Sequence, residues 1–390
     1  MKPMGWRFVV VSDAGLADGK PVRVPAGGPD EIGKALGVTS EAVLHGLAFL
    51  RKHAGDTVQV DLLSAPAKEM AARFRVSVFE PEVRELRNPP LGLVLLDYDF
   101  SHQSGDLAIL QEMAEMARVA QAPMVAGASP AFFGLKELKL LSKIQDLPQR
   151  LMDGAHAGWQ RFQKQEGARW VALTVNRWLL RAPRPGEQPE QLLWGRGAWL
   201  VGAVVARSIG ATGHALDLSG PRAGGFTGMP TRPYFKAANQ AVPLATEIEF
   251  PDTMSQELSR GGFVPVSGRT GNDVLMIPIA VNAFRSAPGR LTVSGTLGYQ
   301  MMAGRLAQLC SLLMEEMPGP AAEAADFLKQ ALTAFLGPLA GKDPAAAVKV
   351  APVEVKDPEG KTVRLAEITV QPDARIEGME FKFVFQLPLR

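Results

Sequence analysis

Asp97 and Asp99 are the pair of side chains in this sequence that most resembles a catalytic site. They follow the apolar residues 93–96 in the segment LLDYDFS. In Asp-based phosphotransferases, one aspartate attacks phosphorus while a second acts as acid and base. That chemistry would need magnesium and a supporting lysine, and Ser101 stands where a threonine or valine usually follows. The alternative is structural, with two aspartates closing a strand and capping the next helix. A magnesium-dependent phosphotransferase is therefore kept only as an alternative hypothesis.

Other motifs imitate catalytic or phosphate-binding sites without completing them. Residues 127–130, GASP, match half of a nucleophile elbow, but a proline replaces the second glycine, so Ser129 is better explained as a helix cap. The glycine and lysine of residues 15–20 and 337–342 have the wrong spacing for a phosphate loop, as do the glycines of 220–228 for a dinucleotide loop. The five histidines are dispersed. The sequence therefore predicts no catalytic residue, no cofactor and no metal site.

Composition gives no case for a nucleic-acid partner. The chain has 390 residues, of which 46% are apolar and 21% charged, and its net charge is +2. This balance is ordinary for a globular protein with one large or two smaller cores. The run RWVALTVNRW could stack bases, but its alternation more simply indicates a strand with arginines at its rim. We therefore expect no binding of nucleic acid.

The sequence indicates a cytoplasmic protein. Cys310 is the only cysteine, so no intrachain disulfide forms, and a reducing compartment is favoured. The apolar run near the amino terminus is too short for a signal peptide, and no stretch of about 18 uninterrupted apolar residues occurs elsewhere. We expect neither export nor membrane insertion.

A βαβ unit at residues 91–130 organises the chain. The apolar run 93–96 predicts a strand that is buried on both faces. Ser104 begins a helix with apolar residues at every third or fourth position, and residues 123–126 begin a second strand. We expect the two strands to pair in parallel through a right-handed crossover.

Residues 1–88 are predicted to form a small β-rich segment. Its expected strands are 6–11, a short one around Val22 and Val24, and a half-buried one at 58–62. A brief helix, capped by Asp30, is expected over residues 30–36. Residues 74–78 fit either a strand or the continuation of a helix that starts at Ala65.

Residues 89–280 are predicted to form a mixed α/β core. Helices are expected at 136–144, 149–165 and 195–209, and strands at 170–174 and 215–218. A hairpin is expected from the runs 263–266 and 274–279. Residues 220–233 hold four glycines and three prolines, which excludes a regular element. We interpret them as an interface loop, in which Arg222 and Arg232 meet acidic partners.

Residues 281–390 are predicted to carry two long helices and a terminal sheet. The helices are expected at 291–314 and 321–335, and three alternating runs follow. The runs 348–355 and 363–370 should form a hairpin around the turn 357–360. The last run, MEFKFVFQLPL, has an apolar face at a chain end. It could pair with a strand of its own chain or with the sheet edge of a neighbouring molecule. The candidate subunit-interface residues at the two terminal strands are Phe8, Val10, Phe381, Phe383 and Phe385.

Eight segments in a fixed order resemble one known family. They are LLDYDFSH, APMVAGASPAFFGL, RWVALTVNRWLLR, LLWGRGAWLVGA, LSGPRAGGFTGMP, TEIEFPD, ELSRGGFVPV and PDARIEGMEFKFVFQL. Together they resemble the large subunit of the type VI secretion contractile sheath, the TssC or VipB family. More weakly, residues 1–80 resemble the core of the small sheath subunit (TssB or VipA), which would make this a fused or condensed sheath protein.

The resemblance implies a mechanical function and no enzymatic one. It implies a core fold shared with phage tail sheaths, a mixed α/β body with a carboxyl-terminal β element. Such subunits form six-membered rings stacked helically around a tube of Hcp protein, exchange β-strands with their neighbours and contract in one stroke to drive the tube outward.

The implied partners are further copies of the chain, Hcp, a baseplate and a small sheath subunit. Two departures from the family are apparent. The insertion near residues 183–193 is reduced, and the small-subunit region that the ClpV ATPase recognises has no counterpart. The remaining alternative is a sheath-like accessory or cap protein that does not polymerise.

Overall fold

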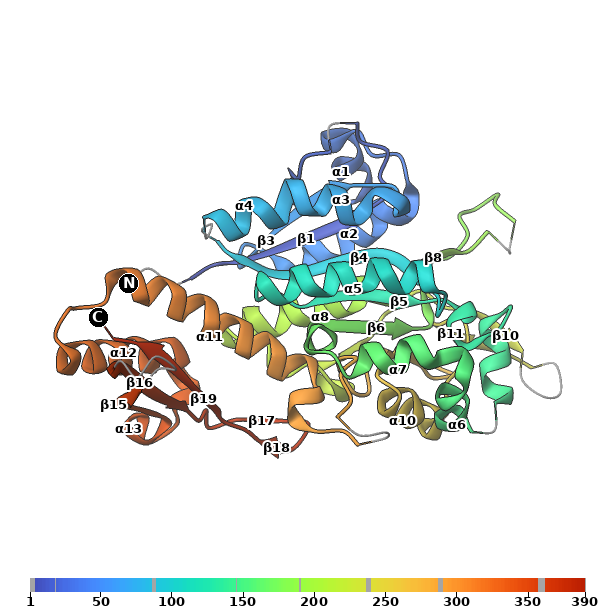
Figure 1. Cartoon of the computed structure of the whole chain (residues 1–390). Helices are drawn as coiled ribbons and strands as arrows, with labels where there is room; N and C mark the ends of the chain where they lie inside the picture. The colour runs from blue at the N-terminus through green and yellow to red at the C-terminus, as the bar shows by residue number, and fades with distance from the viewer. Residues whose placement is uncertain are drawn as a thin grey trace. The chain divides into compact units, whose positions relative to one another are not determined.

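The computed structural model describes residues 4–17, 19–85, 89–144, 146–188, 191–235, 240–286, 290–356 and 362–389. The chain divides into two compact units (Figure 1). The larger unit is Gly5–Met302, and the smaller one combines Met1–Met4 with Ala303–Arg390. Each unit has a sheet of its own.

A seven-stranded sheet, in the order β12-β6-β5-β4-β1-β3-β2, forms the centre of the larger unit. Its strands are β1 (Trp6–Ser12), β2 (Val22–Arg23), β3 (Val58–Ser64), β4 (Leu91–Phe100), β5 (Met124–Ala128), β6 (Val171–Val175) and β12 (Phe263–Pro265). Neighbouring strands are parallel, except that β2 runs antiparallel to β3. The predicted βαβ unit is confirmed, because β4 pairs in parallel with β5 after the helix α5 (Ser104–Val119).

Helices cover both faces of this sheet (Figure 1). One face packs against α3 (Met70–Phe74), α5, α7 (Ala157–Gln163) and α10 (Asp252–Arg260). The other packs against α1 (Pro29–Leu36), α2 (Glu41–Ala54) and α8 (Gly197–Thr212). As predicted, α8 is buried on most sides. Gly202 allows its close approach to the sheet, since a Cβ there would lie 2.4 Å from Leu95 Cδ1. The larger unit is therefore a three-layer α/β/α body.

The sheet joins the first two predicted segments. Strand β1 lies between β3 and β4, with Phe8 opposite Val60 on one side and Leu93 on the other. The predicted boundary at residue 88 therefore does not separate two compact units, because main-chain hydrogen bonds cross it. Strand β3 is almost fully buried rather than half-buried, since both of its edges are paired.

Several predicted elements differ locally. Residues 67–84 are helical, through η1 (Ala67–Glu69), α3, the π-helical turn η2 (Arg75–Phe79) and α4 (Glu80–Arg84). Helix α1 is capped by Gly28 rather than Asp30, because Glu31 Oε2 accepts from the Gly28 N–H. The expected helix at 136–144 is instead the shorter 3-10 helix η4 (Leu138–Lys143), and the expected helix at 149–165 is broken near Gly154. These pieces, with the turns beside them, are η3 (Pro130–Phe133), η4, α6 (Leu147–Met152), η5 (Gly154–His156), α7 and η6 (Glu166–Trp170).

Short elements replace the predicted irregular loop of residues 220–233. They are α9 (Gly220–Ala223), β9 (Gly225–Phe226) and the start of β10 (Arg232–Phe235), which pairs with β11 (Ala241–Leu244). Residues 215–218 form no strand. The predicted hairpin is partly right, since β13 (Ser267–Gly268) pairs with β14 (Leu275–Met276), whereas β12 joins the central sheet instead. A further ribbon pairs β7 (Arg177–Arg181) with β8 (Leu193–Arg196).

The smaller unit contains a three-stranded antiparallel sheet, in the order β15-β16-β19. The predicted hairpin is confirmed by the pairing of β15 (Val348–Lys356) with β16 (Thr362–Val370), although the turn 357–360 lies outside the described residues. Strand β19 (Phe383–Pro388) pairs with β16 of its own chain. The remaining elements of this part of the chain are η8 (Val293–Gly295), α11 (Leu297–Glu316), α12 (Ala321–Leu336), η9 (Gly337–Ala340), α13 (Pro344–Ala347), β17 (Arg375–Ile376) and β18 (Met379–Glu380).

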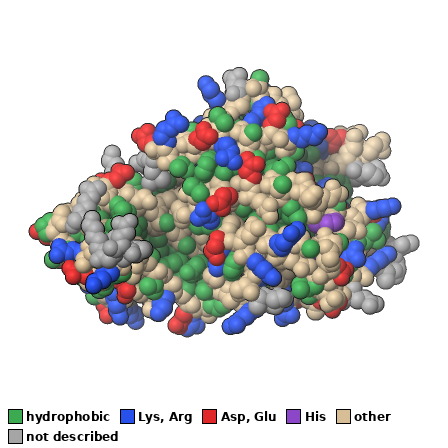
Figure 2. Space-filling view, in the orientation of Figure 1, with side chains coloured by type: hydrophobic (Ala, Val, Ile, Leu, Met, Phe, Trp, Pro, Cys, Tyr) green, Lys and Arg blue, Asp and Glu red, His purple; other side chains and the backbone are tan. Residues whose placement is uncertain are grey.

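Basic and acidic side chains are intermixed over the face shown in Figure 2, which is no footprint for a phosphate backbone. Within the described residues, no helix is both long enough and apolar enough to cross a membrane.

Candidate functional site

The chemistry-bearing residues of the sequence meet at the carboxyl edge of the central sheet. Ser12 ends β1, and Asp97 lies near the end of the neighbouring strand β4. Strands β1 and β4 are neighbours in the sheet. The next long strand after β1, which is β3, lies on the far side of β1, whereas β5, which follows β4, lies on the far side of β4. Such a switch point is where α/β proteins usually bind ligands. Here the Ser12 hydroxyl donates to Asp97 Oδ2 at 2.9 Å.

Asp97 is held by donors from the start of α8. Arg196 Nη1 lies 3.1 Å from Asp97 Oδ1, and the indole N–H of Trp199 donates to the same oxygen at 3.0 Å. The carboxyl side chain of Asp97 is nearly inaccessible to solvent. Burial works to lower the pKa of Arg196, but Asp97 and Asp99 overcome this effect and raise it. Asp97 thus has three internal donors.

Asp99 is also ion-paired. Its Oδ2 lies 3.0 Å from Arg196 Nε and 3.3 Å from Arg177 Nη2. It borders a cleft of about 660 Å³ that Lys136 and Lys139 also line, but Asp97 does not reach this cleft. Attack on phosphorus by Asp97 would require breaking bonds from Ser12, Arg196 and Trp199. The geometry therefore argues against the phosphotransferase hypothesis and indicates a structural ion-pair network.

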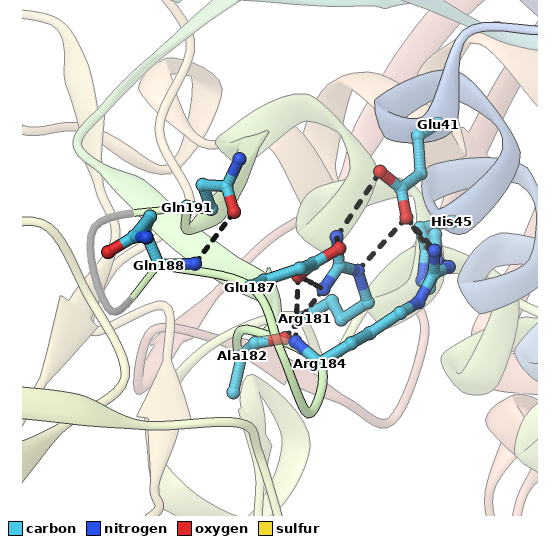
Figure 3. A network of polar contacts seen from close by, with 8 residues as sticks. All are labelled: Glu41, His45, Arg181, Ala182, Arg184, Glu187, Gln188 and Gln191. Carbon is cyan, nitrogen blue, oxygen red and sulfur yellow. Dashed lines mark hydrogen bonds and ion pairs between the residues drawn. The ribbon is translucent and has the colours of Figure 1, made fainter.

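A second network fastens the segment after β7 to helix α2 (Figure 3). Arg181 Nε pairs with Glu41 Oε1 at 3.0 Å, and Arg181 Nη1 with Glu187 Oε2 at 2.7 Å. Arg184 adds a pair to Glu41 at 2.8 Å. Burial is the main cause that lowers the pKa of His45, and Glu41 opposes it. Residues 181–187 are thus fixed to α2 by ion pairs, which the sequence pattern did not predict.

A third charged pair lies inside the sheet. Arg7 interrupts the apolar strand β1, and its guanidinium pairs with the buried Glu82 of α4. Glu82 Oε1 also accepts from the Leu91 N–H at 2.7 Å, at the start of β4. An arginine within an apolar run is the one sequence signal that could have indicated a buried acid nearby.

Phe8 and Val10 are core residues. Both are 0% exposed, and β1 is paired along both of its edges. Neither a side chain nor a strand edge is left there for another molecule. Their predicted role in a subunit interface is therefore wrong, because the amino-terminal strand is central in the sheet rather than free.

The two loop arginines differ. Arg222 is exposed on α9, as an interface residue requires. Arg232 instead donates to the carbonyl oxygens of Pro233, at 3.1 Å, and Glu247, and its guanidinium lies over the rings of Trp194 and Tyr234. Burial lowers its pKa. Arg232 thus stabilises its own loop, and it is not the exposed arginine that the sequence analysis expected to meet an acidic partner.

The three phenylalanines of the terminal run face the interior of the smaller unit. Phe381 and Phe383 are buried, with ring centroids 5.7 Å apart. Phe383 lies opposite Val370, and the half-buried Phe385 lies opposite Ile368. Their side chains therefore stabilise the sheet, whereas its outward face carries Val384, which is 58% exposed.

Comparison with known proteins finds a relative by sequence and several solved structures of similar fold. Over 215 residues the chain is 26% identical to the type VI secretion system sheath protein TssC1 of Pseudomonas aeruginosa strain PAO1. That match covers 50% of this chain and 43% of the relative, so it spans less than half the relative's length.

Solved structures show the same fold at low identity. The chain is similar to the anti-feeding prophage helical sheath in its contracted state, with a TM-score of 0.58, 11% identity and coverage of 97% of this chain and 93% of that one. It is also similar to a chain of the anti-feeding prophage baseplate, with a TM-score of 0.55 and 11% identity. That match covers 98% of this chain and 93% of the other. A sheath tail protein of Desulfitobacterium hafniense matches with a TM-score of 0.52 and 10% identity, over 98% of this chain and 96% of the other. The predicted sheath-like α/β fold is confirmed.

A family model described as "EvpB/VC_A0108, tail sheath N-terminal domain" matches residues 47–283. This match takes in strands β3 to β14 and the Asp97 network apart from Ser12. It also takes in residues 47–80, so part of the segment that resembles the small subunit lies within this match. The match covers more than half of the chain, and the chain therefore belongs to the VipB family of tail sheath proteins.

Proposed function

We propose that this chain is a structural subunit of a type VI secretion contractile sheath, which polymerises around an inner tube and shortens to propel it. Membership of the VipB family and the fold shared with a contracted sheath support the proposal. The proposed partners are further copies of this chain in stacked six-membered rings, the tube protein Hcp, a baseplate and a small sheath subunit. The proposed site of assembly is the cytoplasm.

The observation that carries the proposal is the sheet of the smaller unit. Its edge strands are long, with nine residues in β15 and six in β19. Among the described strands, each of them pairs only with β16. Unpaired main-chain donors and acceptors along such an edge favour the addition of another strand. An extended segment of a second copy would supply it.

The two edges are not equivalent. Pro352 lies in the middle of β15 and removes one main-chain donor there. Strand β19 has no proline between Phe383 and Leu387. Proline is one way in which proteins blunt a sheet edge against pairing. We therefore assign the pairing between copies to the β19 edge.

The larger unit would move as a rigid body during contraction. The Asp97 network ties β1, β4 and the start of α8 together, and helices cover both faces of the sheet. Packed units of this kind switch between two discrete arrangements rather than deforming continuously. A difference of a few kcal/mol per subunit between two lattices would suffice to drive a long sheath.

The test is assembly of the purified chain, alone and with Hcp, followed by negative-stain electron microscopy and by sedimentation. Val384→Lys places a charge on the proposed edge, and Val355→Lys is the matched control. Both valines are exposed, at 58% and 42%, and lie on edge strands of the same sheet face. We expect Val384→Lys to lower the sedimented fraction by about tenfold or more, which corresponds to about 1.4 kcal/mol per contact.

Ribbed hollow cylinders that Val384→Lys abolishes and Val355→Lys leaves intact would support both the function and the edge. Equal assembly of the two variants would overturn the edge assignment. Monodisperse particles of the unaltered chain, even with Hcp, would instead favour a non-polymerising accessory or cap protein.

A further inference from the structure

Two histidines face each other at a place that the sheath proposal does not use. His102 follows β4, and His156 ends η5. Their ring centroids are 4.9 Å apart, with 38° between the ring planes. The pair lies in the larger unit, and it is separate from the Asp97 network, since none of the network's hydrogen bonds or ion pairs involves either histidine.

Each ring binds one of two successive carbonyl groups of η3. His102 Nδ1 lies 2.7 Å from the Ala131 oxygen, and His156 Nε2 lies 2.9 Å from the Phe132 oxygen. A carbonyl oxygen only accepts, so each ring must carry a proton on the nitrogen that faces it. Phe132 packs edge-on against Trp159, at 5.0 Å, and against Phe263, at 5.1 Å. The histidines therefore hold a turn whose aromatic ring is part of the core.

The second nitrogens of the two rings lie in different surroundings. His102 is partly exposed, whereas His156 is 1% exposed. Within the part of the chain that the structure describes, His156 Nδ1 is buried without a hydrogen-bond partner. A proton there would bury a positive charge that no acceptor stabilises. Only the neutral form of His156 fits the folded state.

The charged neighbours of His156 come from three places. Burial is the largest cause that lowers its pKa, and His102 and Arg150 of α6 lower it further. The Phe132 carbonyl and Asp153 oppose this change. Asp153 is itself 3.9 Å from Arg150, which offsets part of its charge. The turn η3 contributes only its main-chain carbonyls at this site.

We propose that His102 and His156 form an acid-sensitive latch that holds η3 at the carboxyl end of β4 and β5 while His156 is neutral. A proton on His156 would bury a positive charge beside the His102 ring, whose centroid lies 4.9 Å away. Acidification would therefore release the turn.

The direction of the pH effect follows from linkage. In the unfolded chain His156 takes up a proton near its ordinary pKa of about 6.5, but in the folded chain only at lower pH. The unfolded state thus binds more protons in this window. The stabilisation by the latch is complete above about pH 6.5 and decreases as the pH falls below that value.

The test follows histidine C–H signals by NMR and amide hydrogen exchange of residues 131–134 in the full chain. His156→Gln keeps an N–H donor for the Phe132 oxygen but cannot titrate. In the unaltered chain, we expect the opening of residues 131–134, corrected for intrinsic exchange, to rise about tenfold for each pKa unit by which His156 is lowered. That rise should disappear in His156→Gln. In His102→Asn, the pKa of His156 should move upward.

His53→Gln is the control, because burial lowers the pKa of His53 to about 4 in a different aromatic cluster. It should leave the response of residues 131–134 unchanged. A His156 signal that titrates at or above pH 6.5 in the unaltered chain would overturn the proposal, whether or not the variants fold. An acid response that persists in His156→Gln would do so as well.

Discussion

The central sheet of the larger unit and the sheet β15-β16-β19 of the smaller unit treat their edges in opposite ways. The central sheet ends in β2, with two residues, and β12, with three residues closed by Pro265. The sheet of the smaller unit ends in β15 and β19, with nine and six residues. Short edges leave little backbone for another chain, whereas long ones invite it. The central sheet therefore leaves less free edge than the sheet β15-β16-β19, on which the proposed pairing between copies rests.

The ion pairs of the two units also differ. In the larger unit, Arg7, Asp97 and Arg181 reach acids or donors on distant elements of the same unit. Among the described residues of the smaller unit, the ion pairs Arg364–Glu354 and Arg375–Glu380 are exposed and join neighbouring strands. Variants of each kind should therefore affect internal stability and assembly differently.

The largest expected effect comes from the buried pair in the larger unit. Glu82→Ala leaves the buried Arg7 with only the more distant Asp61 carboxylate, at 3.8 Å, so it should lower the free energy of unfolding by about 3 to 4 kcal/mol. Chemical denaturation followed by tryptophan fluorescence measures it. Glu80→Ala, at an exposed position of the same helix, is the control. A loss below about 1 kcal/mol would mean that the larger unit is not held by this pair.

Phe383→Ala tests whether the smaller unit folds on its own core. Phe383 is buried against Val370, so its truncation should cost about 3 kcal/mol. Hydrogen exchange should increase in β15, β16 and β19 but not in β1 or β4. Phe235→Ala, at a ring that is 65% exposed, should change neither region. Equal loss of protection in both sheets would contradict the division into two units.

Asp97→Asn should have a moderate effect. It keeps the shape but weakens the bonds from Arg196 and Trp199, so we expect a loss of about 1 to 3 kcal/mol. Thermal unfolding measures it, with the exposed Asp252→Asn as the control. A magnesium-dependent phosphatase activity that disappeared in Asp97→Asn would revive the phosphotransferase hypothesis.

The smallest effect is expected at the partly exposed network of Figure 3. Glu41→Gln removes the acid that Arg181 and Arg184 share, and such pairs contribute about 1 kcal/mol or less. The difference from the unaltered chain should shrink in high salt, because salt screens these charges. A salt-independent loss would show that Glu41 acts through packing instead.

The order of the predicted elements was largely available from the sequence. Continuous apolar runs indicated β1 and β4, the helical spacing after Ser104 indicated α5, and period-two alternation indicated the carboxyl-terminal strands. These patterns are local, and burial on one or both faces produces them directly. The pairing of β15 with β16 followed for the same reason, because a composition typical of turns separates them.

The positions of these elements in space were not available from local patterns. A strand at the start of the chain looked free, but it lies between β3 and β4, so Phe8 and Val10 are core residues. The sequence predicted that Arg232 would bind an acidic partner, but its guanidinium contacts two carbonyl groups and two aromatic rings of its own chain. Both errors have one cause: strand order and side-chain partners depend on contacts between residues far apart in the sequence.

The sequence by itself determined the α/β class, the βαβ unit, the terminal strands and the resemblance to a sheath family. The tertiary structure alone decided that Asp97 is held by Ser12, Arg196 and Trp199. It also decided which strands are edges and that His102 and His156 meet. The periodicity of burial can be read from residues close together in the sequence. The partner of a buried charge, and the strands that remain at a sheet edge, are decided only when distant parts of the chain pack together.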